Sequence, residues 1–285
     1  MRIATYNVQN LFVGPGGAID RGRASIKALR RMLELLDADV LALQEVGGQA
    51  ALERLNEDLA APYPLVRCVT GNSDRGIHLA FLSRIPLNLT SHRSLRLDDE
   101  DGRTLQDFAS AEAASAGRLT PLGFQRDALL AQLKLSSGAM LAIVNLHLKS
   151  RATAAWRRLS SDAMRAAEIR AAASLAEGLA ATGPAMLVGD FNETASSDLM
   201  HPIARLGWID AMRWETGRAR GAAARPPGTY WKKRHTRLDY LLLSADLESS
   251  IEPGSARTLS GALGQRASDH YPVCVDLALE PAERC

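Results

Sequence analysis

Short apolar runs alternate with stretches of helical periodicity along this chain of 285 residues. Apolar side chains recur at helical spacing over 26–36, 52–59 and 155–181, which predicts three helices. Apolar runs of about four to eight residues between turn-forming residues are typical of buried strands. We expect such strands at 2–7, 40–43, 65–69, 78–83, 128–135, 140–147, 185–188, 238–243 and 272–279.

The connection between two of these strands is too short for a crossover helix. A Ser-Ser-Gly turn separates 128–135 from 140–147, which predicts an antiparallel hairpin. Hairpins combined with strand–helix alternation indicate an α/β fold with mixed sheets. Neither an internal repeat nor a linker divides the sequence, so we expect one domain over 1–285.

The composition is ordinary for a soluble globular protein, with 46% hydrophobic and 23% charged residues. A net charge of +2 does not by itself indicate a nucleic-acid partner, so local charge has to decide. Cys68, Cys274 and Cys285 are odd in number and lack metal-site spacing, which favours a reducing compartment without disulfides. With no visible signal peptide or membrane span, we expect a cytoplasmic monomer that does not bind membranes.

Polar residues that are suited to catalysis lie at the ends of the predicted strands. Asp239 opens its strand, whereas most of the others follow the end of an apolar run. Strand ends at one edge of a sheet can converge on a common crevice, and catalytic groups concentrate on loops held by a rigid scaffold. These residues are Asn7, Glu45, Asn145, His147, Asp190, Asn192, Asp239, Asp269 and His270.

The chemistry of these side chains suits a divalent ion and a phosphate ester. The oxygen atoms of Glu45, Asp269 and Asn7 are ligands for Mg²⁺ or Mn²⁺ rather than for Zn²⁺. Asp190 could accept a proton from an attacking water. A charged His270, with a carboxylate such as Asp239 behind it, could stabilise the negative charge that develops on phosphate.

Taken singly, each of these residues has a structural interpretation. An asparagine such as Asn7 after a strand is usually a turn residue, and a lone glutamate such as Glu45 usually lies on the surface. His147 could be a hydrogen-bonded structural histidine, and Asp239 could pair with Arg237. The joint occurrence of these residues in one order favours the catalytic interpretation.

That order resembles the endonuclease/exonuclease/phosphatase superfamily, which includes pancreatic-type DNases and exonuclease III-like repair enzymes. The resemblance covers almost the whole chain and implies a four-layer α/β sandwich, with two mostly antiparallel sheets packed face to face and helices outside. The matching motifs are Tyr6-Asn7-Val8-Gln9-Asn10-Leu11, Leu43-Gln44-Glu45-Val46, Asn145-Leu146-His147-Leu148, Gly189-Asp190-Phe191-Asn192, Arg237-Leu238-Asp239-Tyr240 and Ser268-Asp269-His270.

The resemblance also implies roles for the metal ligands and for the catalytic base. Glu45 would be the principal ligand, with Asn7 nearby and Asp269 at a second or alternating metal position. Asp190 would orient or deprotonate the water.

The remaining residues would contact the phosphate or support the groups that do. Asn145 and Asn192 would hydrogen-bond to the phosphate or to the Asp190 assembly. His147 and His270 would contact phosphate oxygens, and Asp239 would orient His270.

The chain departs from the DNase branch at the partner of His147. In that branch a glutamate ahead of the strand at 78–83 supports this histidine, but here the stretch reads Asp74-Arg75-Gly76-Ile77. Asp74 could replace the glutamate. We therefore expect His147 to bind phosphate rather than to act as a general acid. Three further cations could contact phosphate or form ordinary surface salt bridges, namely Arg84, Arg126 and Lys149.

Two long segments differ sharply in charge. Residues 92–125 are polar, with an acidic run at 98–101, and we expect a solvated loop. Residues 213–237 hold eight Lys or Arg residues and one acid, with aromatic residues between them. Cations bind phosphates and aromatic rings stack on bases, so this segment predicts a nucleic-acid substrate. A plain surface loop is the alternative. The expected contacts are Trp231, Lys232 and Lys233.

Several substrates are compatible with the resemblance, because the family hydrolyses DNA, RNA, inositol phosphates, sphingomyelin and nucleotide conjugates and a fold does not choose among them. A nuclease is our first expectation. A phosphatase or phosphodiesterase for a small or lipid-derived ester is the alternative, and a binding module without catalysis comes third. A long groove with basic walls would favour a polymer, whereas a closed pocket would favour a small ester.

Overall fold

Strand β1 (Arg2–Leu11) lies inside a sheet of six strands and is buried over most of its length. It pairs parallel with β2 (Val40–Val46) and antiparallel with β14 (Val273–Asp276). The computed structural model describes all residues except 153–154, 156, 222–224 and 234–235. The strand order is β13-β14-β1-β2-β4-β3, in which β13 (Arg257–Thr258) and β3 (Leu65–Val69) are the edge strands and β4 (His78–Ser83) lies between β2 and β3.

A second sheet of six strands has the order β11-β12-β10-β9-β8-β5. The hairpin of β8 (Ala128–Lys134) and β9 (Met140–His147) is antiparallel, as the Ser-Ser-Gly turn predicts. The pairing of β9 with β10 (Ala185–Asp190) is parallel. The other strands are β5 (Asn88–Ser91), β11 (Ile209–Asp210) and β12 (Asp239–Leu243).

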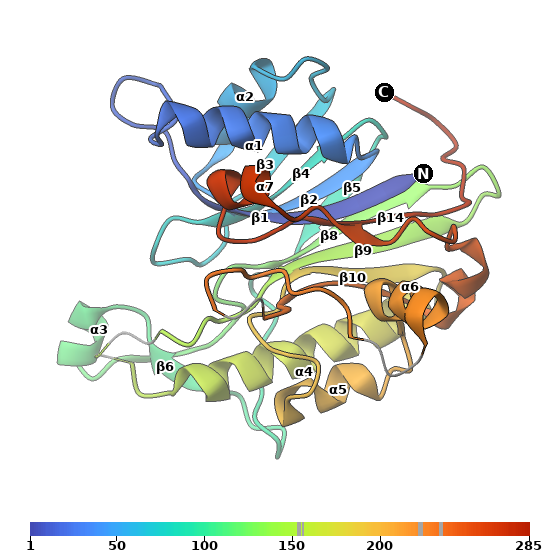
Figure 1. Cartoon of the computed structure of the whole chain (residues 1–285). Helices are drawn as coiled ribbons and strands as arrows, with labels where there is room; N and C mark the ends of the chain where they lie inside the picture. Colours follow the sequence, from blue (N-terminus) through green and yellow to red (C-terminus); the bar gives the residue numbers. More distant parts are fainter. Residues whose placement is uncertain (153–154, 156, 222–224, 234–235) are drawn as a thin grey trace.

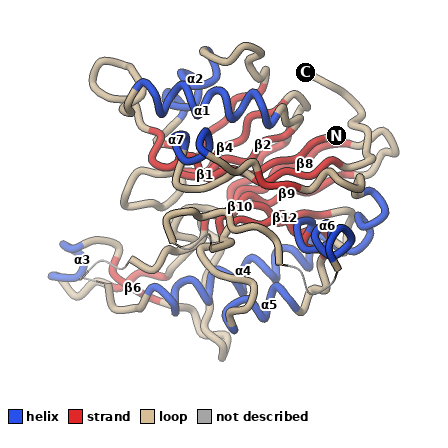
Figure 2. Tube along the Cα trace, viewed as in Figure 1, coloured by secondary structure: helices blue, strands red, loops and turns tan. Residues whose placement is uncertain are grey.

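The two sheets pack face to face and helices cover their outer faces (Figures 1 and 2). One apolar cluster fills the space between the sheets, a second packs beneath α1, α2 and α7, and a third lies between the second sheet and α4 and α5. This arrangement confirms the four-layer α/β sandwich. The helices are α1 (Arg23–Leu36), α2 (Gln49–Glu57), α4 (Ser161–Ala180), α5 (His201–Ala204), α6 (Ala211–Arg220) and α7 (Ala262–Ala267), with short 3₁₀ turns at Asp198–Met200 and Ala245–Ser250.

Burial on both faces explains why these strands are apolar without alternation. In β1, Ile3 faces the space between the sheets, whereas Ala4 and Tyr6 pack towards the helices. A strand that is covered on both sides needs apolar residues at successive positions. Each strand predicted from an apolar run is present, although several bounds differ by a few residues.

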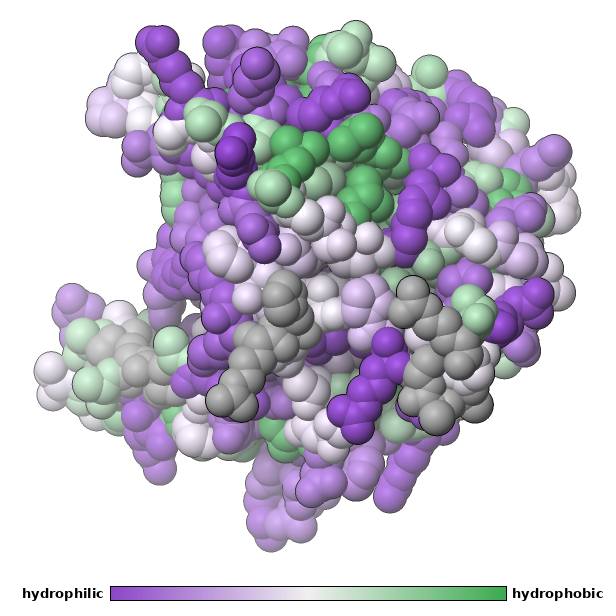
Figure 3. All heavy atoms as spheres, in the orientation of Figure 1, coloured by the Kyte–Doolittle hydropathy of each residue, from purple (hydrophilic) through white to green (hydrophobic). Residues whose placement is uncertain are grey.

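The segment 92–125 contains more structure than the expected solvated loop. It carries β6 (Gln106–Phe108), α3 (Ala111–Ser115) and β7 (Leu119–Pro121), and Phe124 is buried against the second sheet. Only the tip with the acidic run fits the prediction. This lobe projects from the body, and a hollow bordered mostly by hydrophilic residues separates the two on the face seen in Figure 3.

The predicted long helix begins later than expected. Helix α4 starts after Ser160, whose side chain accepts a hydrogen bond from the Ala163 N–H at 3.1 Å, so Ser160 is an N-cap. Over the residues that the structure describes, no helix is both long enough and apolar enough to cross a bilayer.

Candidate active site

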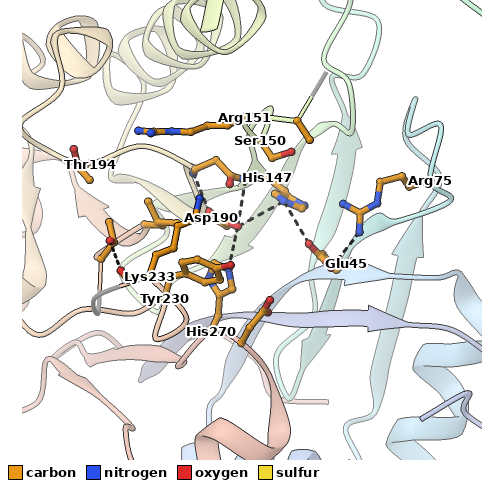
Figure 4. A pocket seen from close by; sticks show the side chains of 15 residues that line it. Glu45, Arg75, His147, Ser150, Arg151, Asp190, Thr194, Tyr230, Lys233 and His270 are labelled. Atoms are coloured by element: carbon orange, nitrogen blue, oxygen red, sulfur yellow. Dashed lines mark hydrogen bonds and ion pairs between the residues drawn. The ribbon is translucent and has the colours of Figure 1, made fainter. Parts of the chain in front are cut away.

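Strand ends from both sheets meet around a cavity of about 340 Å³ (Figure 4). The first sheet contributes Glu45 at the end of β2, and the second contributes His147 and Asp190 at the ends of β9 and β10. Asn192, Asp269 and His270 line the same cavity from the loops that follow or precede strands. The structure therefore brings together predicted residues that lie as far apart in sequence as Glu45 and His270.

Asp190 is buried at the centre of this group. Its Oδ2 accepts a hydrogen bond from Asn7 Nδ2 at 3.0 Å and lies 3.6 Å from His147 Nε2 and 3.7 Å from His270 Nε2. Its Oδ1 accepts from the Asn192 N–H at 2.8 Å. Burial raises the pKa of Asp190 to about 7, against the opposing attraction of His270. A carboxylate with such a pKa can exchange a proton near neutral pH.

Glu45 reaches the cavity through an irregularity at the ends of β1 and β2. The register between the two strands shifts between Asn7 and Leu11, and Gln9, Asn10 and Glu45 all have positive φ. Such backbone conformations are costly for residues other than glycine and recur at functional sites. The Asn10 N–H holds the carboxylate by donating to Glu45 Oε2 at 2.9 Å.

His270 and Asp239 form a buried pair, joined by a contact of 2.8 Å between Nδ1 and Oδ2. Burial disfavours the charged ring, but attraction to Asp239 and Asp190 outweighs it and raises the pKa of His270 to about 10. Thr229 Oγ1 accepts from the Asp239 N–H at 3.1 Å, and Ser268 Oγ accepts from the His270 N–H at 3.1 Å. His270 is therefore an imidazolium at neutral pH, with Nε2 directed towards Asp190.

His147 differs from His270 in having no supporting carboxylate. Among the described residues, none hydrogen-bonds to its Nδ1, although the ring is buried. Asp74 does not hydrogen-bond to this Nδ1, and its Oδ2 instead accepts from Arg157 Nη2 at 2.9 Å. Burial, Arg126 and His270 keep the pKa of His147 well below its usual value. His147 is therefore neutral at the cavity wall.

Asn145 lies outside the cavity, between the two sheets. Its Oδ1 accepts from Gln44 Nε2 at 2.7 Å, and its Nδ2 donates to the carbonyl oxygens of Leu43 at 3.0 Å and Ala80 at 3.1 Å. These contacts use the donors and the acceptor of the amide to join β9 to β2 and β4. The geometry gives Asn145 a place in the scaffold rather than against phosphate.

The three further cations lie in different surroundings. Arg84 pairs with Asp37 at 2.9 Å and is remote from the cavity. Arg126 is buried and donates to the Leu148 carbonyl at 3.2 Å. Lys149 is also buried and donates to the carbonyl oxygens of Ser150 and Ala152. Burial, followed by repulsion from Arg126, lowers the pKa of Lys149 to about 8. None of the three lines the cavity.

Other cations and one aromatic ring do line the cavity and were not predicted. Arg75 donates to Asn10 Oδ1 at 2.7 Å and lies 3.9 Å from Glu45 Oε2 (Figure 4). Arg151 follows β9, and Tyr230 lies with its ring centroid 4.9 Å from that of His270. The stretch Asp74-Arg75-Gly76-Ile77 lacks the expected glutamate, but its sequence contains no pattern that predicts a role for Arg75 in the site.

The described residues of the basic segment 213–237 lie in several different surroundings. Lys233 lines the cavity, Lys232 Nζ donates to Asp269 Oδ2 at 3.3 Å, and Trp231 Nε1 donates to the Ser268 carbonyl at 2.8 Å. Arg237 is paired with Asp210. Arg213 and Arg218 belong to α6, and Arg234 lies outside the described residues.

The donor atoms of the cavity fit a hard divalent ion. The carboxylates of Glu45, Asp190 and Asp269 line it, and none of the three unpaired cysteines does. Asn7 directs Nδ2 towards Asp190, while its Oδ1 accepts from the Gln9 N–H at 3.0 Å.

A second set of possible ligands, Asp190, Asp239 and His270, lies within 4.8 Å of one another. Within this set His270 Nδ1 and Asp239 Oδ2 are joined by a hydrogen bond of 2.8 Å, so we regard it as a hydrogen-bonded group.

The fold and this cluster of carboxylates and histidines define the class of protein as an α/β sandwich with an acidic and histidine-containing cavity at the strand ends of its two sheets. Residues 4–270 match the model of the Endonuclease/Exonuclease/phosphatase family, and the chain belongs to that family. Members include nucleases and phosphodiesterases, and the family generally uses divalent metals. No curated protein matches the chain in sequence.

Solved structures share the fold over nearly the whole chain. The human Nocturnin catalytic domain with bound sulfate anion is 20% identical, with a TM-score of 0.63, and the match covers 98% of this chain and 94% of that one. An AP endonuclease from Archaeoglobus fulgidus is 15% identical, with a TM-score of 0.59, and the match covers 97% of this chain and 99% of that one. Truncated Caenorhabditis elegans TDP2 is 15% identical, with a TM-score of 0.56, and the match covers 97% of this chain and 96% of that one.

Proposed function

We propose that this protein hydrolyses phosphodiester bonds in nucleic acid with water and a bound Mg²⁺ or Mn²⁺ ion. The observation that carries the proposal is the position of Asp190, which contacts Asn7, His147 and His270 in a cavity that also contains Glu45 and Asp269. A base, a fixed positive charge and hard oxygen ligands thus face one space.

Each side chain has a task that follows from its protonation state. Asp190, ionised above about pH 7, takes a proton from the attacking water. The His270 imidazolium stabilises negative charge on the phosphate, and Asp239 holds its ring in place. Neutral His147 contacts a phosphate oxygen. When bound by Glu45 and Asp269, the divalent ion supplies further positive charge to the phosphate.

The choice of nucleic acid rests on the groups around the cavity. Arg75, Arg151 and Lys233 approach it from three separate segments and can bind successive phosphates. Tyr230 adds a ring on which a base can stack. A small phosphate ester is the second candidate, because a cavity of about 340 Å³ is near the lower end of the range of roughly 300–1,000 Å³ for ligand pockets.

A substrate panel with and without metal tests this proposal. We expect EDTA to abolish hydrolysis of single-stranded DNA, RNA or bis-p-nitrophenyl phosphate, and Mg²⁺ or Mn²⁺ to restore it. Full activity in EDTA would rule out the metal role. Hydrolysis of inositol phosphates or sphingomyelin without nucleic acid would favour the second candidate. Lack of hydrolysis of any ester with either metal would indicate a binding module.

A further inference from the structure

A second cavity, of about 650 Å³, lies between α5, α6 and the outer face of the second sheet. We call it the α6 pocket. Its walls combine aliphatic and aromatic side chains, and the arginines of α6 stand at its edge. The walls include Met200, Ile203, Trp208, Trp214, Tyr240 and Leu242.

The α6 pocket adjoins the catalytic cavity through two elements. In the loop after β10, Thr194 lines the catalytic cavity and Ala195 lines the α6 pocket. At the start of β12, Asp239 faces the catalytic histidine, while Tyr240 faces the pocket. The Thr194–Ala195 loop therefore forms part of the wall of both cavities.

The charges at the pocket favour an anion. The guanidinium of Arg218 lies 4.8 Å from the ring centre of Trp214, and within the described residues Arg213 forms no ion pair. The lining acid, Asp210, is neutralised because both of its oxygens accept from Arg237. The indole N–H of Trp214 donates to Glu248 Oε1 at 3.2 Å, which holds the ring in place at the pocket wall.

We infer that the α6 pocket binds the base and phosphate of a nucleotide in the same strand whose ester is cut at the catalytic cavity. This inference rests on the proposed function. Indole rings, here those of Trp208 and Trp214, beside arginine planes are a combination that holds single-stranded nucleic acid, because rings stack on bases and guanidinium groups pair with phosphates. An acyl chain would use the aliphatic walls but not the aromatic rings with their stacked cation.

Gly217 allows the pocket to be filled without disturbing the fold. It lies on α6 and lines the cavity, and a Cβ atom built on it meets nothing within 4 Å. Its φ is not in the left-handed region, so a side chain is not strained there. Gly217→Phe would therefore occupy the pocket, whereas Gly217→Ala changes the same residue and leaves most of the space.

The measured quantity is kcat/KM for a single-stranded oligonucleotide divided by kcat/KM for bis-p-nitrophenyl phosphate. We expect Gly217→Phe and the double variant Arg213→Glu/Arg218→Glu each to lower this ratio about tenfold or more. Gly217→Ala and the charge-matched Lys27→Glu/Arg67→Glu, which alters exposed cations on α1 and β3, should leave it unchanged. An unchanged ratio in both test variants would overturn the inference.

Two further arms separate this inference from the proposed function. If the test variants lower hydrolysis of a lysophospholipid but not of the oligonucleotide, the pocket holds an acyl chain and the inference is wrong. If wild-type protein cleaves no ester, the proposed function fails. The inference about the pocket is then tested by binding alone, with fluorescence anisotropy of a labelled oligonucleotide and the Asp190→Asn variant. Weaker binding when Gly217→Phe is added would support the pocket, and equal binding would exclude it.

Discussion

Asp190 and His270 are buried side by side with different protonation states at neutral pH. Burial raises the pKa of the carboxyl to about 7, while Asp239 and Asp190 hold a proton on the imidazole up to about pH 10. Separate environments for neighbouring titratable groups are the usual way in which one site obtains both a base and a positive charge. Two of our predictions concern this pair.

The first prediction concerns the proton acceptor. Asp190→Asn keeps a side-chain oxygen for the Asn192 N–H but cannot take a proton from water. We expect turnover of bis-p-nitrophenyl phosphate to fall by roughly 10²–10⁴-fold. Thermal unfolding monitored by circular dichroism should show that the variant is folded. Turnover close to that of wild type would remove Asp190 from this role.

The second prediction concerns the pH profile of kcat. Because the ionised form of Asp190 is the base and its pKa is raised to about 7, activity should fall as pH decreases through about 7. Because protonated His270 is required, activity should fall again as pH rises through about 10. Asp239→Asn removes the attraction that holds this proton, so its alkaline limb should move to lower pH. An alkaline limb that stays in place would contradict the role of the pair.

The order of the sequence motifs predicted which side chains share the active site. It did not predict all of their contacts. Glu45, Asp190 and His270 follow or precede strands whose ends converge, and that could be foreseen. The position of Asn145 could not, because its partners Gln44 and the Leu43 and Ala80 carbonyls belong to the opposite sheet. Contacts between sheets depend on packing, which local periodicity does not encode.

The loop from Thr229 to Thr236 attaches the basic segment to the active site. The Tyr230 N–H donates to the Thr236 carbonyl at 2.8 Å, and the Trp231 N–H donates to the Asp269 carbonyl at 3.3 Å. Lys233 thereby comes to the cavity, while Lys232 is engaged by Asp269. The loop can place one cation against a phosphate of the substrate.

The third prediction follows from this loop. Lys233→Glu should weaken oligonucleotide binding. The slope of log K against log salt concentration should decrease in magnitude by about 1, as expected when one phosphate contact is lost. Fluorescence anisotropy over a range of salt concentrations would measure both effects. Lys27→Glu, on the outer face of α1, serves as the charge-matched control. An equal salt slope in both variants would show that Lys233 does not contact phosphate.

Elements outside the regular strands were harder to foresee. No helix was predicted at α6, although Asp210 caps it by accepting from the Arg213 N–H at 3.3 Å and is an N-cap type of residue. Arginine-rich helices with little apolar periodicity give a weak signal. The strands of the lobe at 92–125 are only three residues long, which is too short for a pattern.

The active site of the whole molecule is shared between its two sheets. Asn7 and Glu45 come from the first sheet, whereas Asp190 and Asp239 come from the second. Polar bridges between Asn7 and Asp190, and between Gln44 and Asn145, cross the interface. The relative position of the sheets therefore sets the distances within the catalytic group.

The fourth prediction tests one of these bridges. Asn145→Leu removes the side-chain donor to two buried carbonyl groups, whereas Gln44 Nε2 keeps Thr5 Oγ1 at 2.9 Å as an acceptor, and an unsatisfied buried group costs ~1–3 kcal/mol. We expect urea denaturation to show a free energy of unfolding lower by at least this amount. Asn88→Leu, at an exposed position in β5, should have a much smaller effect. Equal effects of the two substitutions would show that the bridge is dispensable.

The pairing of β1 with β14 has a consequence for biosynthesis. His270 lies just ahead of β14 in the sequence. Residues 273–276 of β14 pair with β1. A ribosome-bound chain that ends before this strand already contains Glu45 and Asp190, yet it lacks the strand that brings His270 to them. Pairing of residues 273–276 with β1 is thus the step after which the site can be complete.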